Sequence, residues 1–214
     1  RRVEPVIEAL VNQTNVPVSV DTYKAVVART ALNCGASLVN DVSGLRYDPD
    51  LAGEIVAQRA GLILAHTRGR SSDMYSQASY KAATEEIVSE LEWSLEAASD
   101  AGITREHVIV DPGLGFAKRA EHSMAVLSQL DRLRLLDRPI LVGPSRKSFL
   151  TAVLGNVPPA ERDWGTAGAI AASILLGAHV VRVHSVRAMV DVVRVTDAIR
   201  MHREGVSVTA TDQA

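Results

Sequence analysis

The sequence contains little cysteine and no long hydrophobic run. Its one cysteine, Cys34, cannot form a disulfide within the chain, which is typical of a reducing compartment such as the cytoplasm. Cys34 lies in an Ala-rich segment with helical character, and this setting favours packing over a nucleophilic role. The apolar runs are short and interrupted, well below the roughly 20 residues that a membrane-spanning helix needs. The sequence therefore predicts neither a disulfide-stapled fold nor a membrane protein.

An excess of charge of one sign is also missing. The 23 Lys and Arg residues nearly balance the 25 Asp and Glu residues, which gives a formal net charge of −2. Without a global basic field, we expect no nucleic acid and no anionic membrane surface as a partner. The chain has no P-loop and no G-x-G-x-x-G sequence opening a helix, the usual markers of ATP and dinucleotide binding. A zinc signature is absent as well.

The sequence does contain a repeated unit, a short apolar run followed by a helical segment. Six β-branched runs are apolar almost throughout, as strands covered on both faces must be. Their alternation with amphipathic segments predicts a parallel sheet with crossover helices. The predicted strands are 16–21, 37–41, 61–66, 108–111, 139–143 and 179–184. The predicted helices are 23–34, 49–60, 79–101, 120–136, 163–177 and 186–202, after a leading helix.

Polar or reactive side chains follow nearly every predicted strand. They are Asp21, Asn40 and Asp41, His66, Asp111, Ser145 with Arg146 and Lys147, and Arg182 with His184. A (β/α)8 barrel gathers the carboxyl ends of all its strands around one site, whereas single caps explain only one or two such residues. The predicted fold is therefore an α/β (β/α)8 TIM barrel with six of its eight strands visible. We expect a fragment that lacks strands 1 and 2, with one domain over 1–204 and a loose tail over 205–214.

Two segments have the chemistry of an anion site. Arg182 and His184 alternate with valines, so both point to the same side of the last strand, where such barrels often bind phosphate. A strand-end pair of Arg182 with an acid remains the alternative. The segment "GPSRKSFL" (143–150) adds two cations and two hydroxyls at the start of a predicted helix. The alternative is that these two cations only form the first turn of a helix and bind no anion. The helix dipole disfavours cations at that end of a helix.

Two further strand ends suit a planar nitrogen heterocycle. The Asp111 carboxylate can accept two parallel N–H bonds from an aminopyrimidine edge, and the Asn40 amide offers both a donor and an acceptor. Gly113 and Gly115 allow the chain to turn tightly beside Asp111. A simple turn or helix cap is the alternative for Asp111, because aspartate favours both positions.

These motifs resemble those of the dihydropteroate synthases, (β/α)8 enzymes of the folate pathway, over nearly the whole chain. Six motifs in order carry the resemblance: "VSVDTYKAVVARTAL", "GASLVNDVSG", "LILAHTRG", "VIVDPGLGFAK", "GPSRKSFL" and "VVRVHSV". It implies that p-aminobenzoate attacks the methylene group of 6-hydroxymethyl-7,8-dihydropterin diphosphate, releasing pyrophosphate and forming dihydropteroate. It also implies Mg²⁺ on the diphosphate, small-molecule substrates, a homodimer and a cytoplasmic location.

The resemblance assigns a role to each matching residue. The implied pterin ligands are Asp21, Asn40, Asp111 and Lys147. The implied diphosphate ligands are Arg182 and His184, which with Lys147 form the catalytic set. Ser145 and Phe116 are expected to flank the p-aminobenzoate. The family's metal-binding Asn would lie upstream of Arg1, so no metal ligand is expected in this chain.

Two other functions remain open. One is a pterin-binding methyltransferase barrel that passes a methyl group to a corrinoid, although it has no reason to keep the "SRK" sequence or the Arg182–His184 pair. The other is a non-catalytic pterin-binding remnant, suggested by the strands missing upstream. The role of His66 also stays open between a substrate-covering loop and a structural histidine.

Overall fold

The computed structural model describes residues 2–205, so the predicted tail after residue 204 lies almost entirely outside the described residues. The strands are β1 (Ser19–Asp21), β2 (Leu38–Asp41), β3 (Gly61–Ala65), β4 (Val108–Asp111), β5 (Leu141–Val142) and β6 (Val180–Val181). The α-helices are α1 (Glu4–Val11), α2 (Ala25–Asn33), α3 (Leu51–Ala57), α4 (Ala83–Asp100), α5 (Ala120–Ser128), α6 (Thr151–Leu154), α7 (Asp163–Leu175) and α8 (Val186–Arg203). Short 3₁₀ helices are η1 (Arg105–His107), η2 (Leu130–Leu136), η3 (Ser148–Leu150) and η4 (Pro159–Glu161).

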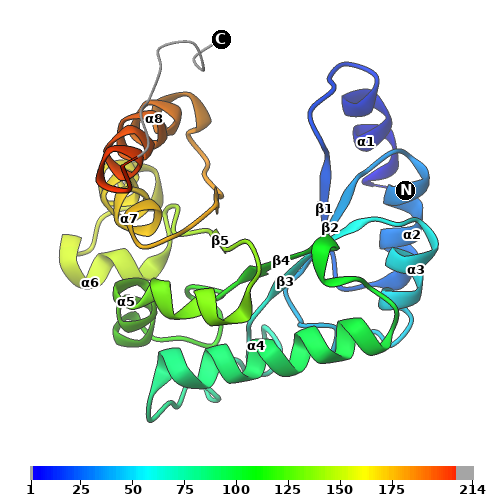
Figure 1. Cartoon of the computed structure of the whole chain (residues 1–214), viewed down its shortest axis with the longest axis horizontal. Coiled ribbons are helices and arrows are strands. Elements are labelled where there is room, and N and C mark those ends of the chain that lie inside the picture. The colour runs from blue at the N-terminus through cyan, green and yellow to red at the C-terminus, as the bar shows by residue number, and fades with distance from the viewer. Residues whose placement is uncertain (1, 206–214) are drawn as a thin grey trace.

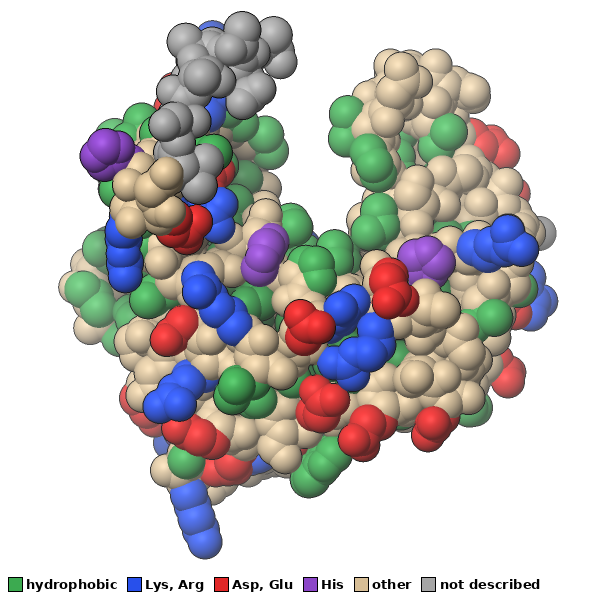
Figure 2. Space-filling model, viewed as in Figure 1, with side chains coloured by type: hydrophobic (Ala, Val, Ile, Leu, Met, Phe, Trp, Pro, Cys, Tyr) green, Lys and Arg blue, Asp and Glu red, His purple; other side chains and the backbone are tan. Residues whose placement is uncertain are grey.

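All strand pairs are parallel and follow the order of the chain. Strands β1 to β4 form one sheet, β5 pairs with β6, and a bridge between Val110 and Ile140 joins the two. In Figure 1 the strands lie in the middle and the helices run around their outside. The ring of helices is open between the arm with α1 and the arm with α8, and Figure 2 shows the molecule hollowed there. The predicted α/β barrel architecture is confirmed.

The core lies between the strands and the surrounding helices. Val39, Leu62, Leu64 and Val110 are fully buried, which explains why these strands read as continuous apolar runs. Helix α4 packs against the core along its length. Its buried apolar residues recur every three or four positions: Ile87, Leu91, Leu95 and Ala98. Among the described residues, no helix is both long and apolar enough to cross a membrane.

Glycines cap two helices directly before a strand. Gly35 and Gly177 have φ values of +100° and +107°, a backbone region that L-residues rarely adopt. In both cases the N–H group after the glycine bonds the carbonyl five residues back, at 3.0 Å after Gly35 and 2.9 Å after Gly177. These glycines turn the chain from α2 into β2 and from α7 into β6.

Five of the six predicted strands are longer than the observed ones, and three of them, at β1, β5 and β6, differ by more than one residue. Pro17 and Pro139 have no N–H to give to a neighbouring strand, so regular pairing begins after them in β1 and β5. Strand β6 ends early because the N–H of His184 bonds the hydroxyl of Ser145 at 3.2 Å instead of a strand carbonyl.

A helical segment begins within 143–150, as predicted, but only at Ser148. Arg146 has a left-handed φ of +58°, which a helical turn cannot contain. The turn η3 therefore begins at Ser148, and α6 follows it with only 4 residues. Farther upstream, the predicted helix 120–136 divides at Gln129 into α5 and η2. The "SRK" sequence is therefore followed directly by a short 3₁₀ turn and one turn of α-helix.

Candidate active site at the carboxyl ends of the strands

Side chains from β2, β4 and the end of β6 meet at one end of the barrel. The Arg182 guanidinium donates from Nη2 to Oδ1 of Asn40 at 2.8 Å, across 142 residues of sequence. Its Nη1 lies 4.0 Å from Oδ2 of Asp111. The structure thus brings together three predicted site residues whose contact no local sequence pattern contains.

The amide of Asn40 is only half satisfied. Asn40 is 2% exposed, and its Oδ1 accepts the bond from Arg182. Its buried Nδ2 has no hydrogen-bond partner among the described residues. A buried donor without a partner costs about 1–3 kcal/mol, so this N–H group is poised for an acceptor on a ligand.

Asp111 combines the two roles considered for it. It is 4% exposed, and its Oδ1 accepts the N–H of Gly113 at 2.7 Å, which closes a tight turn. Its Oδ2 faces Arg182 and can accept further bonds. The turn cap therefore uses one carboxylate oxygen and leaves the other for a ligand.

The segment after Asp111, the β4 loop (residues 112–118), passes very close to β3. Gly113 has a φ of +64°, and a Cβ atom on it would lie 2.0 Å from the carbonyl oxygen of His66. Gly115 also has a positive φ, of +79°. The tight loop predicted from these two glycines is confirmed.

We expect Gly113→Ala to lower the free energy of unfolding by about 2–4 kcal/mol, because the methyl group forces apart two buried backbone segments. Thermal and urea unfolding measure the change. The matched control is Gly53→Ala within α3, where nothing lies within 4 Å of the added Cβ. That control is expected to raise stability by about 0.5–1 kcal/mol. Equal stabilities for the two variants would contradict the close approach.

Lys147 and Phe116 lie together over the β4 loop. The Lys147 ammonium donates to the carbonyl of Leu114 and lies 4.7 Å from the centroid of the Phe116 ring. Burial lowers the pKa of Lys147, while the nearby Asp111 carboxylate raises it and Arg182 lowers it. Lys147 therefore places a partly desolvated cation between the carboxylate of Asp111 and an aromatic ring.

Ser145 and His184 are bonded directly to each other. The Ser145 hydroxyl lies 2.8 Å from Nδ1 of His184 and also accepts the His184 backbone N–H. When the hydroxyl donates its one O–H to Nδ1, a neutral His184 ring carries its proton on Nε2. His184 is exposed, so this Nε2–H is available to an anion.

Two predicted contributors lie apart from this group. Arg146 forms an ion pair with Asp163 at 2.8 Å and bonds the Ser185 hydroxyl at 2.9 Å, so it braces the chain against α7. Of the two cations in "SRK", only Lys147 faces the site. Asp21 is exposed and lies opposite Asn40 in the sheet, but its carboxylate forms no hydrogen bond or ion pair with a described residue.

His66 is buried, and both of its ring nitrogens contact other side chains. It is 3% exposed, its Nε2 lies 2.9 Å from Oε2 of Glu90, and its Nδ1 lies 2.8 Å from the ammonium of Lys118. Burial lowers the pKa of His66 to about 4. Arg68 anchors the start of the following segment to Glu90. Lys118 is not predicted from the sequence, because its partner His66 lies 52 residues away along the chain.

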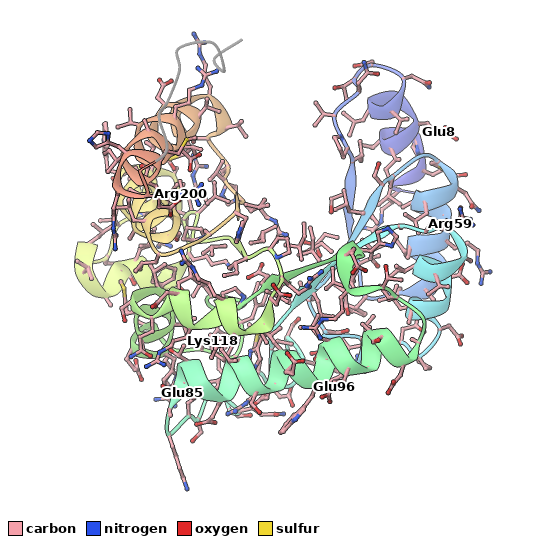
Figure 3. The ribbon with its side chains drawn as sticks, viewed as in Figure 1. Glu8, Arg59, Glu85, Glu96, Lys118 and Arg200 are labelled. Carbon is pink, nitrogen blue, oxygen red and sulfur yellow. The ribbon has the colours of Figure 1, made fainter. Side chains whose placement is uncertain are left out.

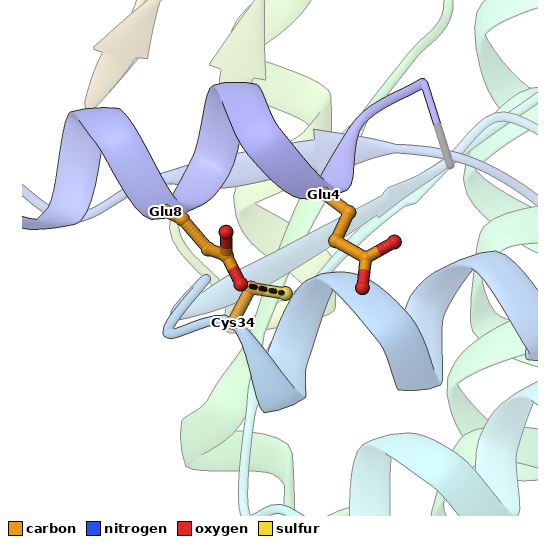
Figure 4. Close-up of side chains that lie close together, drawn as sticks. All are labelled: Glu4, Glu8 and Cys34. Carbon is orange, nitrogen blue, oxygen red and sulfur yellow. Dashed lines mark hydrogen bonds between the residues drawn. The ribbon is translucent and has the colours of Figure 1, made fainter.

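The described residues do not offer a fitting Mg²⁺ site at the strand ends. Mg²⁺ prefers oxygen ligands, whereas this region holds the cations Lys147 and Arg182, and the Asp111 oxygen that the turn leaves free faces Arg182. The single group of three potential metal ligands within residues 2–205 is Glu4, Glu8 and Cys34, between α1 and α2 (Figure 4). Burial raises the pKa of the Cys34 thiol, which disfavours the thiolate that a metal needs. The Cys34 side chain packs against the core instead.

Comparison with known proteins agrees with this geometry. Residues 1–184 match the family model described as "Pterin binding enzyme". The dihydropteroate synthase of Synechocystis is 40% identical over 198 residues, which are 92% of this chain and 68% of that protein. The Xanthomonas albilineans dihydropteroate synthase in complex with 7,8-dihydropteroate has a TM-score of 0.87 at 36% identity, over 94% of this chain and 73% of that one. The same enzyme with 4-aminobenzoic acid has a TM-score of 0.87 at 37% identity, over 94% of this chain and 71% of that one. The chain therefore belongs to the dihydropteroate synthase family of pterin-binding enzymes, which are transferases of folate biosynthesis.

Proposed function

We propose that the carboxyl ends of β2, β4 and β6 hold 6-hydroxymethyl-7,8-dihydropterin diphosphate for condensation with p-aminobenzoate. The pterin ring lies against Asn40, Asp111 and Lys147, with Asp21 at the edge of the same site. The diphosphate lies against Arg182 and His184. The Xanthomonas albilineans complexes with 7,8-dihydropteroate and 4-aminobenzoic acid support this assignment of substrates.

One observation carries the proposal, the unpartnered Nδ2 of Asn40. This buried donor faces the end of the strands at which the Asp111 carboxylate offers an acceptor. A pterin ring presents both N–H donors and ring acceptors along its edges, so it satisfies both groups at once. An apolar ligand would leave the Asn40 donor and the Asp111 acceptor desolvated and unpaired.

The reaction exchanges a C–O bond for a C–N bond. The lone pair of the aryl amine attacks the methylene carbon, the C–O bond breaks, and its electron pair leaves on the diphosphate. The ammonium product then loses a proton to water. An aryl amine is already nucleophilic, so the main demand is stabilisation of the leaving anion.

The side chains of this chain can meet that demand in part. The Arg182 guanidinium and the Nε2–H of His184 are placed to bond the diphosphate oxygens. The buried hydroxyl of Ser145 orients the His184 ring, and Phe116 offers its face to the aminobenzoate. Enzymes of this family use Mg²⁺, which neutralises diphosphate charge when bound. We assign it no ligand among the described residues.

The test is an assay of pyrophosphate release by the complete natural polypeptide. We expect release that requires both the pterin diphosphate and p-aminobenzoate, with one dihydropteroate formed per pyrophosphate. A corrinoid methyltransferase would instead methylate cob(I)alamin from a methylated pterin. A non-catalytic relative would bind pterin without turnover. Either of these outcomes would contradict the proposal.

Three broader features of the protein stay predictions. Residues 1–204 are proposed to act as a single pterin-binding domain, and the family resemblance points to a homodimer in the cytoplasm. Sedimentation equilibrium of the natural polypeptide tests the dimer, because a monomer and a dimer differ twofold in mass.

A further inference from the structure

Lys118, which is labelled in Figure 3, is a buried lysine beneath the candidate site. It is 2% exposed, and its ammonium has three acceptors within reach. They are Nδ1 of His66 at 2.8 Å, the Phe116 carbonyl at 3.0 Å and the His66 carbonyl at 3.4 Å. An ammonium group has three N–H donors and no acceptor, so these partners match its charged form.

The partners of His66 continue this arrangement away from the site. Its Nε2 lies 2.9 Å from the Glu90 carboxylate, which accepts from the Arg68 guanidinium at 3.0 Å and 3.2 Å. With Nε2–H donating to Glu90, the Nδ1 lone pair is free to accept from Lys118. The polar chain of Arg68, Glu90, His66 and Lys118, of which His66 and Lys118 are buried, therefore connects α4 to the β4 loop, with each donor facing an acceptor.

The β4 loop is held from two sides by lysines. Lys147 bonds the Leu114 carbonyl from the site, and Lys118 bonds the Phe116 carbonyl from within the protein. Just before these contacts along the chain, Gly113 approaches the His66 carbonyl too closely to admit a side chain. The loop follows Asp111 directly and carries Phe116, so its path sets the separation of the proposed pterin carboxylate and the proposed aminobenzoate ring.

We propose that Lys118 is a positioning residue, which holds the β4 loop in its ligand-binding shape through the Phe116 carbonyl and the His66 ring. It acts on both substrates without touching either of them. This inference rests on the proposed function of the strand ends. Lys118 would thus belong to the site although its side chain lies behind the β4 loop and does not line the site.

The charge on Lys118 also makes substrate binding and stability depend on pH. Burial lowers the pKa of Lys118 to about 7 from 10.5; Asp111 and Glu90 raise it, and Lys147 and Arg68 lower it. Loss of the proton removes one of the three N–H donors, so the grip on the loop weakens as the pH rises through 7. The unfolded chain binds more protons between about pH 7 and 10.5, so Lys118 makes the folded state more stable as the pH rises through this window.

The test replaces Lys118 by Met in the complete natural polypeptide, with the exposed Lys81→Met as the matched control. Losing hydrogen bonds from a charged donor predicts about ten- to hundredfold higher KM values for both substrates, with kcat lowered by less than about threefold. In the wild type, KM for p-aminobenzoate should rise between pH 6 and 9 relative to the Lys118→Met variant. The rise in stability above pH 7 should disappear in that variant, and Lys81→Met should match the wild type in all respects.

A folded Lys118→Met variant with unchanged KM values, or one that loses only kcat, would overturn the inference. If the Lys118→Met variant does not fold, the same kinetic measurements are made on Glu90→Gln. This substitution weakens the acceptor for the His66 N–H and leaves Lys118 in place. Higher KM values at constant kcat in Glu90→Gln would support the inference, and unchanged values would overturn it. Failure of the proposed function is a separate result, since the wild type would then release no pyrophosphate from the pterin diphosphate and p-aminobenzoate.

Discussion

Replacing Asp111 by asparagine is expected to weaken pterin binding by about two to three orders of magnitude while leaving the fold intact. The amide oxygen can still accept the N–H of Gly113 and keep the turn closed. The amide NH₂ then occupies the position of Oδ2, which faces Arg182 and, in the proposed complex, the N–H donors of the pterin. A donor facing donors in a buried site loses the hydrogen bonds and leaves the partner groups unpaired.

Titration calorimetry with 6-hydroxymethyl-7,8-dihydropterin measures this effect in the complete natural polypeptide. Asp41→Asn is the matched control, because Asp41 is also a buried strand-end carboxylate. It accepts backbone N–H bonds from Ser43 and Leu45 at 2.8 Å and 2.6 Å. Asp41→Asn should lower the melting temperature without changing pterin affinity. Unchanged affinity in Asp111→Asn would remove Asp111 from the site.

Arg182→Ala is expected to reduce kcat/KM for the pterin diphosphate by about a hundred- to a thousandfold, since a charged donor to the leaving group is lost. The affinity for the free pterin should fall by less than about tenfold. That smaller loss reflects the hydrogen bond from Arg182 to Asn40, which orients the amide before the ring binds.

Calorimetry with both ligands and steady-state kinetics together separate these two effects. The control is Arg187→Ala, which removes an exposed arginine at the start of α8 and should change neither quantity. Equal weakening of the free pterin and the diphosphate would show that Arg182 serves only to hold Asn40 and Asp111 in place.

The strands and the glycine caps of two helices can be predicted from the sequence because their signals are local. The continuous burial of Val39 and Leu62 follows directly from apolar runs covered on both faces. Gly35 and Gly177 occupy the one backbone conformation that their helix ends require. The gathering of Asn40, Asp111 and Arg182 followed from a topological rule, since parallel barrel strands present all their carboxyl ends on one face.

The residues that the sequence did not place correctly depend on distant partners. Arg146 was counted as a cation of the anion site, but Asp163 and Ser185 hold it 17 and 39 residues away along the chain. His66 remained open because its environment comes from Glu90 and from Lys118, 24 and 52 residues away. Neither spacing is a recognisable motif, so only the folded structure reveals these contacts.

The central claim is that the strand-end residues Asn40 and Asp111 bind the pterin ring. A crystal structure of the complete natural polypeptide with 6-hydroxymethyl-7,8-dihydropterin tests it most directly. We predict the Asp111 carboxylate within about 3 Å of two N–H groups of the ring and the Asn40 Nδ2 at a similar distance from a ring acceptor. A ring bound elsewhere, with Asn40 Nδ2 still unpartnered, would contradict the account.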